Sequence, residues 1–157
     1  MNKNQYAVKI FEKMMSKIKK RAIVLGAGGF IGSHLVNFLK KESYWVKGVD
    51  LKKPEFSKTG ADEFVIGDLR DPVFVKKIFN QKFDEVYQLA ADMGGAGYVF
   101  TGNNDADIMS NSVIINLNVL KNAVKSNSKK VFFSSSACIY PGHNQISAKS
   151  PKLSEES

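Results

Sequence analysis

The sequence has few of the residues that crosslink a chain, bind metals or anchor it in a membrane. It holds one cysteine among 157 residues, so no disulfide can form within it, and such sparing use of cysteine is typical of a reducing cytosol. Its two histidines, His34 and His143, stand alone, without a second ligand at the spacing of a metal site. No apolar run is long enough to span a bilayer. We therefore expect a cytoplasmic protein with no bound metal and no membrane partner, and the length suits one domain with its own core.

Positive charge is concentrated at the N-terminus. The formal net charge is +8, and residues 1–21 hold seven of the 23 basic residues and one of the 15 acidic ones, which leaves a net charge of only +2 for the rest. Apolar residues recur four apart among these lysines and predict a helical leader over residues 1–20: Tyr6, Ile10, Met14 and Ile18. The leader lacks the apolar core of a secretory signal and the interleaved aromatic residues of a single-strand groove. We expect a solvated extension and no nucleic-acid partner, with a weak role at a membrane surface as the alternative.

A glycine-rich turn joins an apolar run to an amphipathic helix. The run Ala22–Leu25 suits a buried strand, and apolar residues at helical spacing follow from Leu35. Three glycines lie between them at a Gly-x-x-Gly-x-x-Gly spacing: Gly26, Gly29 and Gly32. Such a turn is an anion site, because its backbone can approach a pyrophosphate and the helix N-terminus presents unpaired N–H groups. By itself the turn is also compatible with plain strand-to-helix packing.

Asp50 closes the next apolar run, eighteen residues after Gly32. A carboxylate at the end of the second strand accepts hydrogen bonds from a ribose 2′-hydroxyl and repels a 2′-phosphate, so it favours NAD over NADP. The alternative is that Asp50 only starts the turn before Pro54. The glycine turn at the right distance upstream makes the cofactor interpretation the stronger one.

Strands and helices alternate along the rest of the chain. Helices are expected over residues 30–41, 72–80 and 106–126, and strands over residues 22–25, 44–50, 63–68, 84–91 and 130–134. The alternation predicts an α/β fold, a Rossmann-like doubly wound parallel sheet with strand order 3-2-1-4-5. Asp68 follows the third strand, where it either reaches an adenine amino group or, like Asp71 before Pro72, caps the next helix.

In such sheets ligands bind beyond the carboxyl ends of the strands. Four groups of residues fall at that edge: the turn from Gly26, Asp50, a second glycine-rich loop around Gly94, and the segment 134–138. Small residues, Ala90 and Ala91, end the fourth strand and allow a ligand to lie against its backbone. The convergence of these signals predicts a binding site at this edge.

Together these motifs resemble the extended short-chain dehydrogenase/reductase family of nucleotide-sugar epimerases and dehydratases. The resemblance covers residues 21–157 and rests on four motifs: Gly26-Ala-Gly-Gly-Phe-Ile-Gly32, Asp50, Asp68-Leu69 and Leu89-Ala-Ala91. It implies an NAD-binding Rossmann domain whose cofactor is held by residues at the strand ends: Gly26, Gly29, Phe30, Ile31, Gly32, Asp50, Asp68, Leu69, Leu89, Ala90 and Ala91.

Two further stretches, residues 90–97 and 135–141, resemble the GDP-mannose 3,5-epimerase subfamily. That resemblance implies GDP-mannose as the substrate, transient oxidation at the sugar C4 by NAD, epimerisation at C3 and C5, and re-reduction. It makes Cys138 a base and Ser136 a hydrogen-bond partner of the C4 oxygen. It also implies a sugar pocket lined by Gly94, Ser136, Ala137 and Cys138. The alternative for Cys138 is a small buried residue after a strand, since a thiol acts as a base only where its surroundings lower its pKa.

The chain departs from the family pattern at several points. None of its tyrosines has a lysine four residues later, so the family's Tyr-x-x-x-Lys pair is missing, as are the second acid/base lysine and the sugar-binding region. We expect this chain to be the N-terminal portion of an epimerase, which retains the cofactor-binding residues but does not turn over substrate. We expect the full-length form to be a homodimer. Two alternatives stay open: a GDP-fucose synthase or another nucleotide-sugar epimerase or dehydratase, against which Asp50 and Ala137 argue, and a catalytically inactive dinucleotide-binding module.

Overall fold

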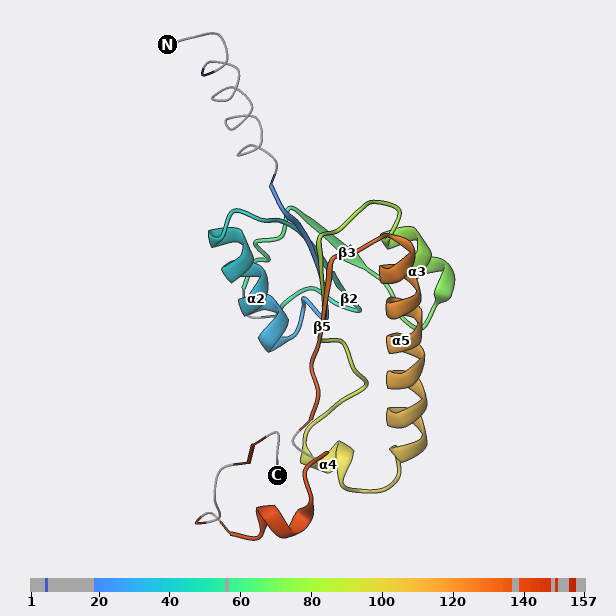
Figure 1. Cartoon of the computed structure of the whole chain (residues 1–157). Coiled ribbons are helices and arrows are strands. Elements are labelled where there is room, and N and C mark those ends of the chain that lie inside the picture. The colour runs from blue at the N-terminus through green and yellow to red at the C-terminus, as the bar shows by residue number, and fades with distance from the viewer. Residues whose placement is uncertain are drawn as a thin grey trace.

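Five parallel strands form one sheet in the computed structural model, which describes residues 5, 19–55, 57–136, 139–147, 149 and 153–154. The strands are β1 (Arg21–Leu25), β2 (Trp45–Asp50), β3 (Glu63–Ile66), β4 (Glu85–Gln88) and β5 (Lys130–Phe133). Their order across the sheet is β3-β2-β1-β4-β5, and every neighbouring pair is parallel (Figure 1). The α/β class and the strand order expected from the sequence are therefore confirmed.

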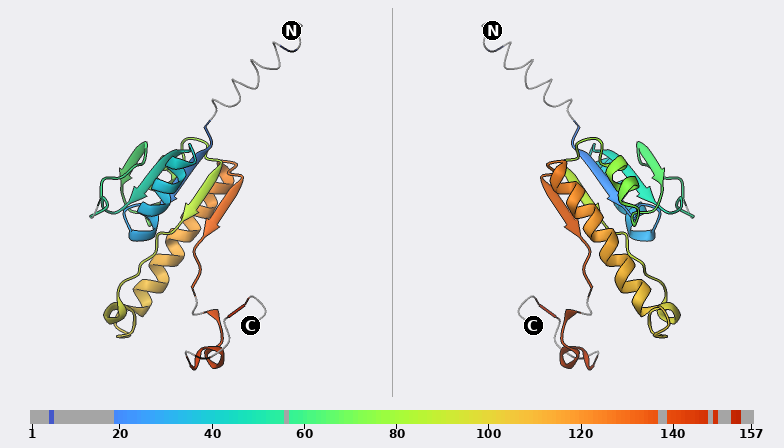
Figure 2. Two further views of the ribbon diagram at one scale, coloured as in Figure 1. Left: turned by 90° about the vertical axis from the view of Figure 1, so that its left-hand side faces the viewer. Right: turned by 90° about the vertical axis from the view of Figure 1, so that its right-hand side faces the viewer.

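Helices cover both faces of the sheet. Helix α2 (Phe30–Lys41) lies on one face, and helices α3 (Pro72–Ile78) and α5 (Asp105–Lys125) lie on the other (Figure 2). Two short elements come as additions to the expected set, α4 (Ala96–Val99) and the 3₁₀ turn η2 (Gly142–Gln145). The glycines before α4 predict a loop, and this single turn forms because Gly95 O accepts hydrogen bonds from the backbone of Tyr98 and Val99. No helix in the described ranges is long and apolar enough to cross a membrane.

The central strand β1 explains why the sheet needs two helical layers. Ile23 and Leu25 pack into the cluster on the α3 and α5 side, whereas Ala22 and Val24 pack into the cluster on the α2 side. All four side chains are fully buried. A strand covered on both faces has a continuous apolar sequence rather than an alternating one, which is the pattern of this segment.

Some expectations fall on parts of the chain that the structure does not describe. The predicted leader over residues 1–20 lies outside the described residues except at Gln5, Lys19 and Lys20, and Ala137 and Cys138 lie outside them as well. His34, expected on the first helix, is exposed on α2, with its ring edge-on to that of Phe30 at 4.9 Å between centroids.

Candidate cofactor-binding site

The turn between β1 and α2 brings the helix N-terminus to the carboxyl edge of the sheet. Gly26 has φ +86, a backbone conformation that favours glycine, and its N–H donates to Val49 O at 2.9 Å. A Cβ at Gly32 would lie 2.7 Å from the carbonyl carbon of Gly26, so only glycine lets α2 start this close to β1. The first N–H groups of a helix lack intrahelical partners, and here they face the edge where the strands end.

Asp50, the last residue of β2, is in direct contact with the glycine turn. Its Oδ2 accepts a hydrogen bond from Gly28 N at 2.8 Å, and its Oδ1 accepts one from Lys52 N at 3.3 Å. A Cβ at Gly28 would lie 2.9 Å from the Asp50 carboxyl carbon. Each carboxylate oxygen has about two acceptor positions, so the group keeps capacity for a ligand hydroxyl.

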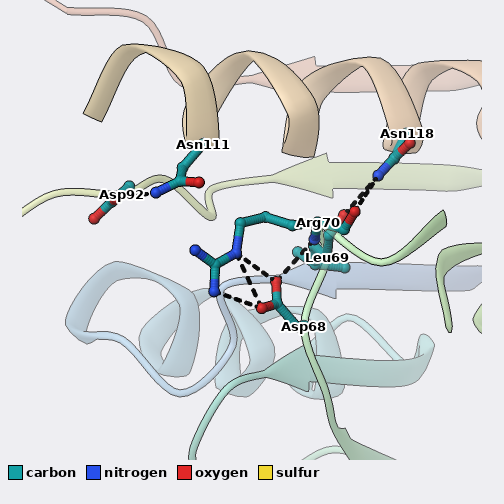
Figure 3. Close-up of polar contacts among 6 residues, drawn as sticks. All are labelled: Asp68, Leu69, Arg70, Asp92, Asn111 and Asn118. Atoms are coloured by element: carbon teal, nitrogen blue, oxygen red, sulfur yellow. Dashed lines mark hydrogen bonds and ion pairs between the residues drawn. The ribbon is translucent and has the colours of Figure 1, made fainter. Parts of the chain in front are cut away.

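The residues after β3 form a turn with an internal ion pair. The Asp68 carboxylate accepts hydrogen bonds from the Arg70 backbone N at 2.8 Å, from its Nε at 3.0 Å and from its Nη2 at 2.6 Å (Figure 3). These hydrogen bonds from the Arg70 side chain hold the pKa of Asp68 below its usual value. The helix cap is Asp71, whose carboxylate accepts from Val73 N at 2.8 Å. Asp68 is therefore not the cap, and its predicted contact with an adenine stays a prediction.

The end of β4 is packed against the glycine turn. A Cβ at Gly26 would lie 2.9 Å from Ala90 N, and the buried Gln88 side chain donates to Ala90 O at 2.7 Å. Asp92 follows, and its two oxygens accept from Tyr98 OH at 3.1 Å and from Asn111 Nδ2 at 2.7 Å. The backbone of the β4–α4 connection is thus held in place on two sides.

These strand ends enclose a cavity of about 430 Å³, a volume typical of small-molecule sites. Eight residues predicted to hold the cofactor line it: Gly26, Gly29, Asp50, Asp68, Leu69, Leu89, Ala90 and Ala91. Seven further residues line it that were not assigned to the site from the sequence: Leu51, Gly67, Arg70, Asp92, Met93, Asn111 and Ile115. The four strands β1 to β4 therefore contribute to one cleft.

Other predicted site residues are elsewhere in the described structure. Phe30 and Ile31 are 80% and 66% exposed at the start of α2 and do not line the cavity, and Gly32 is buried beneath the turn. Gly94 faces Tyr98, because a Cβ there would lie 2.7 Å from the Tyr98 Cβ. Ser136 is exposed beyond β5 and is not a lining residue. Eight of the eleven predicted cofactor residues thus line one cavity, whereas Gly94 and Ser136 do not line it, and the other two predicted sugar-side residues lie outside the described residues.

Three of the added lining residues had a signal in the sequence. Arg70 directly follows Asp68-Leu69, so it had to lie at the same strand end. Asn111 and Ile115 are four residues apart on α5, one turn of helix, and therefore share a face. The direction in which this face points, toward the cleft, follows only from the packing of α5 on the sheet. Among the described residues, no group of three or more histidine, cysteine, aspartate or glutamate side chains could hold a metal ion.

The doubly wound sheet, the glycine turn and the cleft together define a dinucleotide-binding α/β domain. The residues present fit such a cofactor, since a Cβ at Gly29 would meet no described atom closer than Gly26 O at 3.4 Å, which leaves space for a ligand in front of the turn. A sequence profile described as the NAD dependent epimerase/dehydratase family matches residues 22–156. The chain belongs to this family, whose cofactor is NAD.

Individual relatives agree with this assignment. GDP-mannose 3,5-epimerase 1 of Oryza sativa subsp. indica is 41% identical over 130 residues, which are 82% of this chain and 34% of the rice protein. GDP-mannose 3,5-epimerase of Arabidopsis thaliana is 39% identical over 134 residues, which are 84% of this chain and 35% of that protein. Among solved structures, UDP-glucose 4-epimerase from Bifidobacterium longum in complex with NAD+ and UDP matches with a TM-score of 0.66 and 27% identity, covering 77% of this chain and 38% of that one. The chain thus spans about a third of the length of the curated relatives it matches.

Proposed function

We propose that this chain is the NAD-binding portion of a GDP-mannose 3,5-epimerase. The observation that carries the proposal is the single cleft that joins the glycine turn, Asp50, Asp68 and the end of β4. The identity of about 40% to GDP-mannose 3,5-epimerases from two plants supports the choice of sugar nucleotide. We expect the full-length form to be a cytoplasmic homodimer.

Different residues of the cleft would hold different parts of the cofactor. The N–H groups of the turn from Gly26 to Gly29 would bind the pyrophosphate, and the Asp50 carboxylate would accept hydrogen bonds from the adenosine ribose. Asp68 and Leu69 would border the adenine. When bound, NAD supplies an acceptor for the hydride of the sugar C4 and later returns it.

The sugar side of the proposal rests on resemblance. Cys138 would be one base of the epimerisation at C3 and C5, and a second acid/base lysine, from the part of the relatives that this chain does not span, would act on the opposite face of the sugar. Ser136 would hydrogen-bond the C4 oxygen next to Gly94 and Ala137. The Tyr-x-x-x-Lys pair of the family would come from the part of the relatives that this chain does not span. We therefore expect the chain alone to bind NAD without converting GDP-mannose.

The test is a calorimetric titration of the wild-type chain and its Asp50→Ala variant with NAD and with NADP. Wild type should bind NAD more tightly than NADP, because the Asp50 carboxylate accepts from the ribose hydroxyl and repels a 2′-phosphate. The variant should bind NAD about tenfold more weakly, which corresponds to loss of about 1.4 kcal/mol, and should lose the preference over NADP. Asp62→Asn is the control, since that carboxylate pairs with Lys40 at 2.6 Å outside the cleft. Equal weakening of both cofactors would contradict the role of Asp50, and no binding of NAD to wild type would contradict the proposed function.

A further inference from the structure

One face of helix α5 reaches both sides of the cleft. Asn111 and Asn118 are seven residues apart, close to two helical turns, so their side chains project in nearly the same direction. Ile115 lies between them, is 8% exposed and lines the cavity. Figure 3 shows the two amides pointing from α5 toward different loops, Asn111 toward Asp92 and Asn118 toward the turn after β3.

Asn118 holds the turn that carries Asp68. Its Nδ2 donates to Leu69 O at 3.1 Å and to Arg70 O at 3.0 Å, so both N–H groups of one amide bind successive carbonyls. Leu69 is only 5% exposed, and its carbonyl is partly buried with it. The hydrogen bonds therefore set the distance between α5 and the turn, and the Asp68–Arg70 pair is placed at the cleft by the same turn.

Asn111 holds the opposite side of the cleft, at the loop after β4. Its Nδ2 donates to Asp92 Oδ2 at 2.7 Å, and the adjacent Ser112 Oγ accepts from Asp92 N at 3.3 Å. Asp92 opens the loop after β4, whose strand lies on the other side of β1 from β2 and β3. In a doubly wound sheet the adenosine half of a dinucleotide lies over the first βαβαβ unit and the other half over the second.

We infer that Asn118 and Asn111 are positioning residues for the two ends of the cofactor, Asn118 for the adenosine end and Asn111 for the nicotinamide end. The inference rests on the proposed function, because it assigns ends to an NAD in this cleft. Asn118 acts without lining the cavity, through the backbone of Leu69 and Arg70. Asn111 acts through Asp92 and the loop that follows.

The experiment compares AMP with NAD as ligands of the whole chain, because AMP carries the adenosine end alone. Asn118→Asp keeps the side-chain shape and replaces the donor by an oxygen that faces two carbonyls. We expect it to weaken AMP and NAD by the same factor, about tenfold, in line with loss of two hydrogen bonds. Asn111→Asp faces Asp92 with a like charge, and we expect it to weaken NAD by a similar factor while AMP binding changes less than twofold.

Asn122→Ala is the matched control. Asn122 lies one turn beyond Asn118 on α5, and its amide donates to the carbonyl of Asn118 at 2.8 Å rather than to a loop. Thermal unfolding of each variant identifies the folded fraction, and Asn118→Ser serves in place of Asn118→Asp if the latter does not fold. A general loss of structure would weaken both ligands in both variants, so the split between AMP and NAD is the decisive readout.

The possible outcomes distinguish a failure of the proposed function from a failure of this inference. If wild type binds neither ligand, the proposed function fails and the inference fails with it. If wild type binds both but Asn118→Asp or Asn118→Ser binds AMP as tightly as Asn122→Ala does, the inference alone is overturned. Equal losses of AMP and NAD binding in Asn111→Asp would also overturn the assignment of ends.

Discussion

The glycines of the turn after β1 differ in what a side chain would meet. At Gly32 a Cβ would come within 2.7 Å of the Gly26 backbone and within 2.9 Å of the Ala27 Cα. At Gly29 the nearest described atom would be Gly26 O at 3.4 Å, an ordinary contact. Gly32 is thus required by the packing of α2 on β1, whereas the space in front of Gly29 is free for a ligand.

This difference predicts opposite phenotypes for two alanine variants. Gly32→Ala should lower the free energy of unfolding by about 2 kcal/mol, because overpacking a tight contact typically costs 1–3 kcal/mol and outweighs the gain of up to about 1 kcal/mol from better helix propensity. Gly29→Ala should cost less than about 1 kcal/mol, chiefly from a poorer N-cap, yet weaken NAD binding about tenfold by obstructing the pyrophosphate. Urea unfolding and NAD titration of both variants would check this. A Gly29→Ala chain that binds NAD like wild type would place the pyrophosphate elsewhere.

At the scale of elements, one carboxylate connects three strands at the edge of the sheet opposite the cleft. Asp84 Oδ2 accepts from Arg21 N at 3.0 Å at the start of β1, and its Oδ1 pairs with Lys129 Nζ at 3.1 Å just before β5. The Asp84 carbonyl also accepts from the backbone of Lys129 and Lys130. The residue therefore connects β1, β4 and β5 where all three begin.

The contacts of Asp84 predict a dependence of stability on pH. The backbone hydrogen bond from Arg21, followed by the one from the Lys129 side chain, holds the pKa of Asp84 below its usual value. A carboxyl group whose pKa is lower in the folded state stabilises the fold above its unfolded pKa of about 4, and this contribution is lost as the pH falls through the folded pKa. Since the side chain is 25% exposed, we expect Asp84→Asn to cost about 1–2 kcal/mol at pH 7.

The measurement is urea unfolding at pH 7 and at pH 3, with Glu42→Gln as the control for removal of an exposed carboxylate. The difference between wild type and Asp84→Asn should shrink at pH 3, because the unfolded wild-type chain then binds a proton at Asp84 more readily than the folded state does, which removes part of the stabilisation. A difference of the same size at both pH values would mean that the effect comes from the amide geometry and not from the charge.

At the scale of the whole molecule, the topology and most of the cofactor side of the cleft could be predicted from the sequence, whereas the sugar side stays a prediction. Apolar runs that end in Gly26 or Asp50 indicate buried parallel strands, and alternation with helices leaves few permitted topologies. Leu89 and Ala90 follow directly from the strand order, because a strand next to β1 must end beside its glycine turn. By contrast, Asn118 acts through side-chain hydrogen bonds to the backbone of Leu69 and Arg70, which are distant from it in sequence, and no local pattern encodes such contacts.

The cleft is built from segments spread over much of the chain, so a bound cofactor should stabilise the domain as a unit. Its lining comes from the ends of strands on both sides of β1, from Gly26 and Asp50 to Ala91, and from Ile115 on α5. A ligand that binds only the folded state adds about 2.7 kcal/mol at a concentration of 100 Kd. For a domain of this size that corresponds to a rise of roughly 5–11 °C in the midpoint of thermal unfolding.

We therefore expect NAD at 100 times its Kd to raise the unfolding midpoint of wild type by roughly 5–11 °C. AMP at 100 times its own Kd should produce a similar rise, because the linkage depends on saturation and not on ligand size. At the same NAD concentration, Asp50→Ala should show a smaller rise than wild type, in proportion to its weaker affinity. Scanning calorimetry of wild type with NAD, of wild type with AMP and of Asp50→Ala with NAD tests these expectations. Two separate transitions, of which only one responds to NAD, would show that the halves of the cleft unfold independently and that the sheet does not act as one cooperative unit.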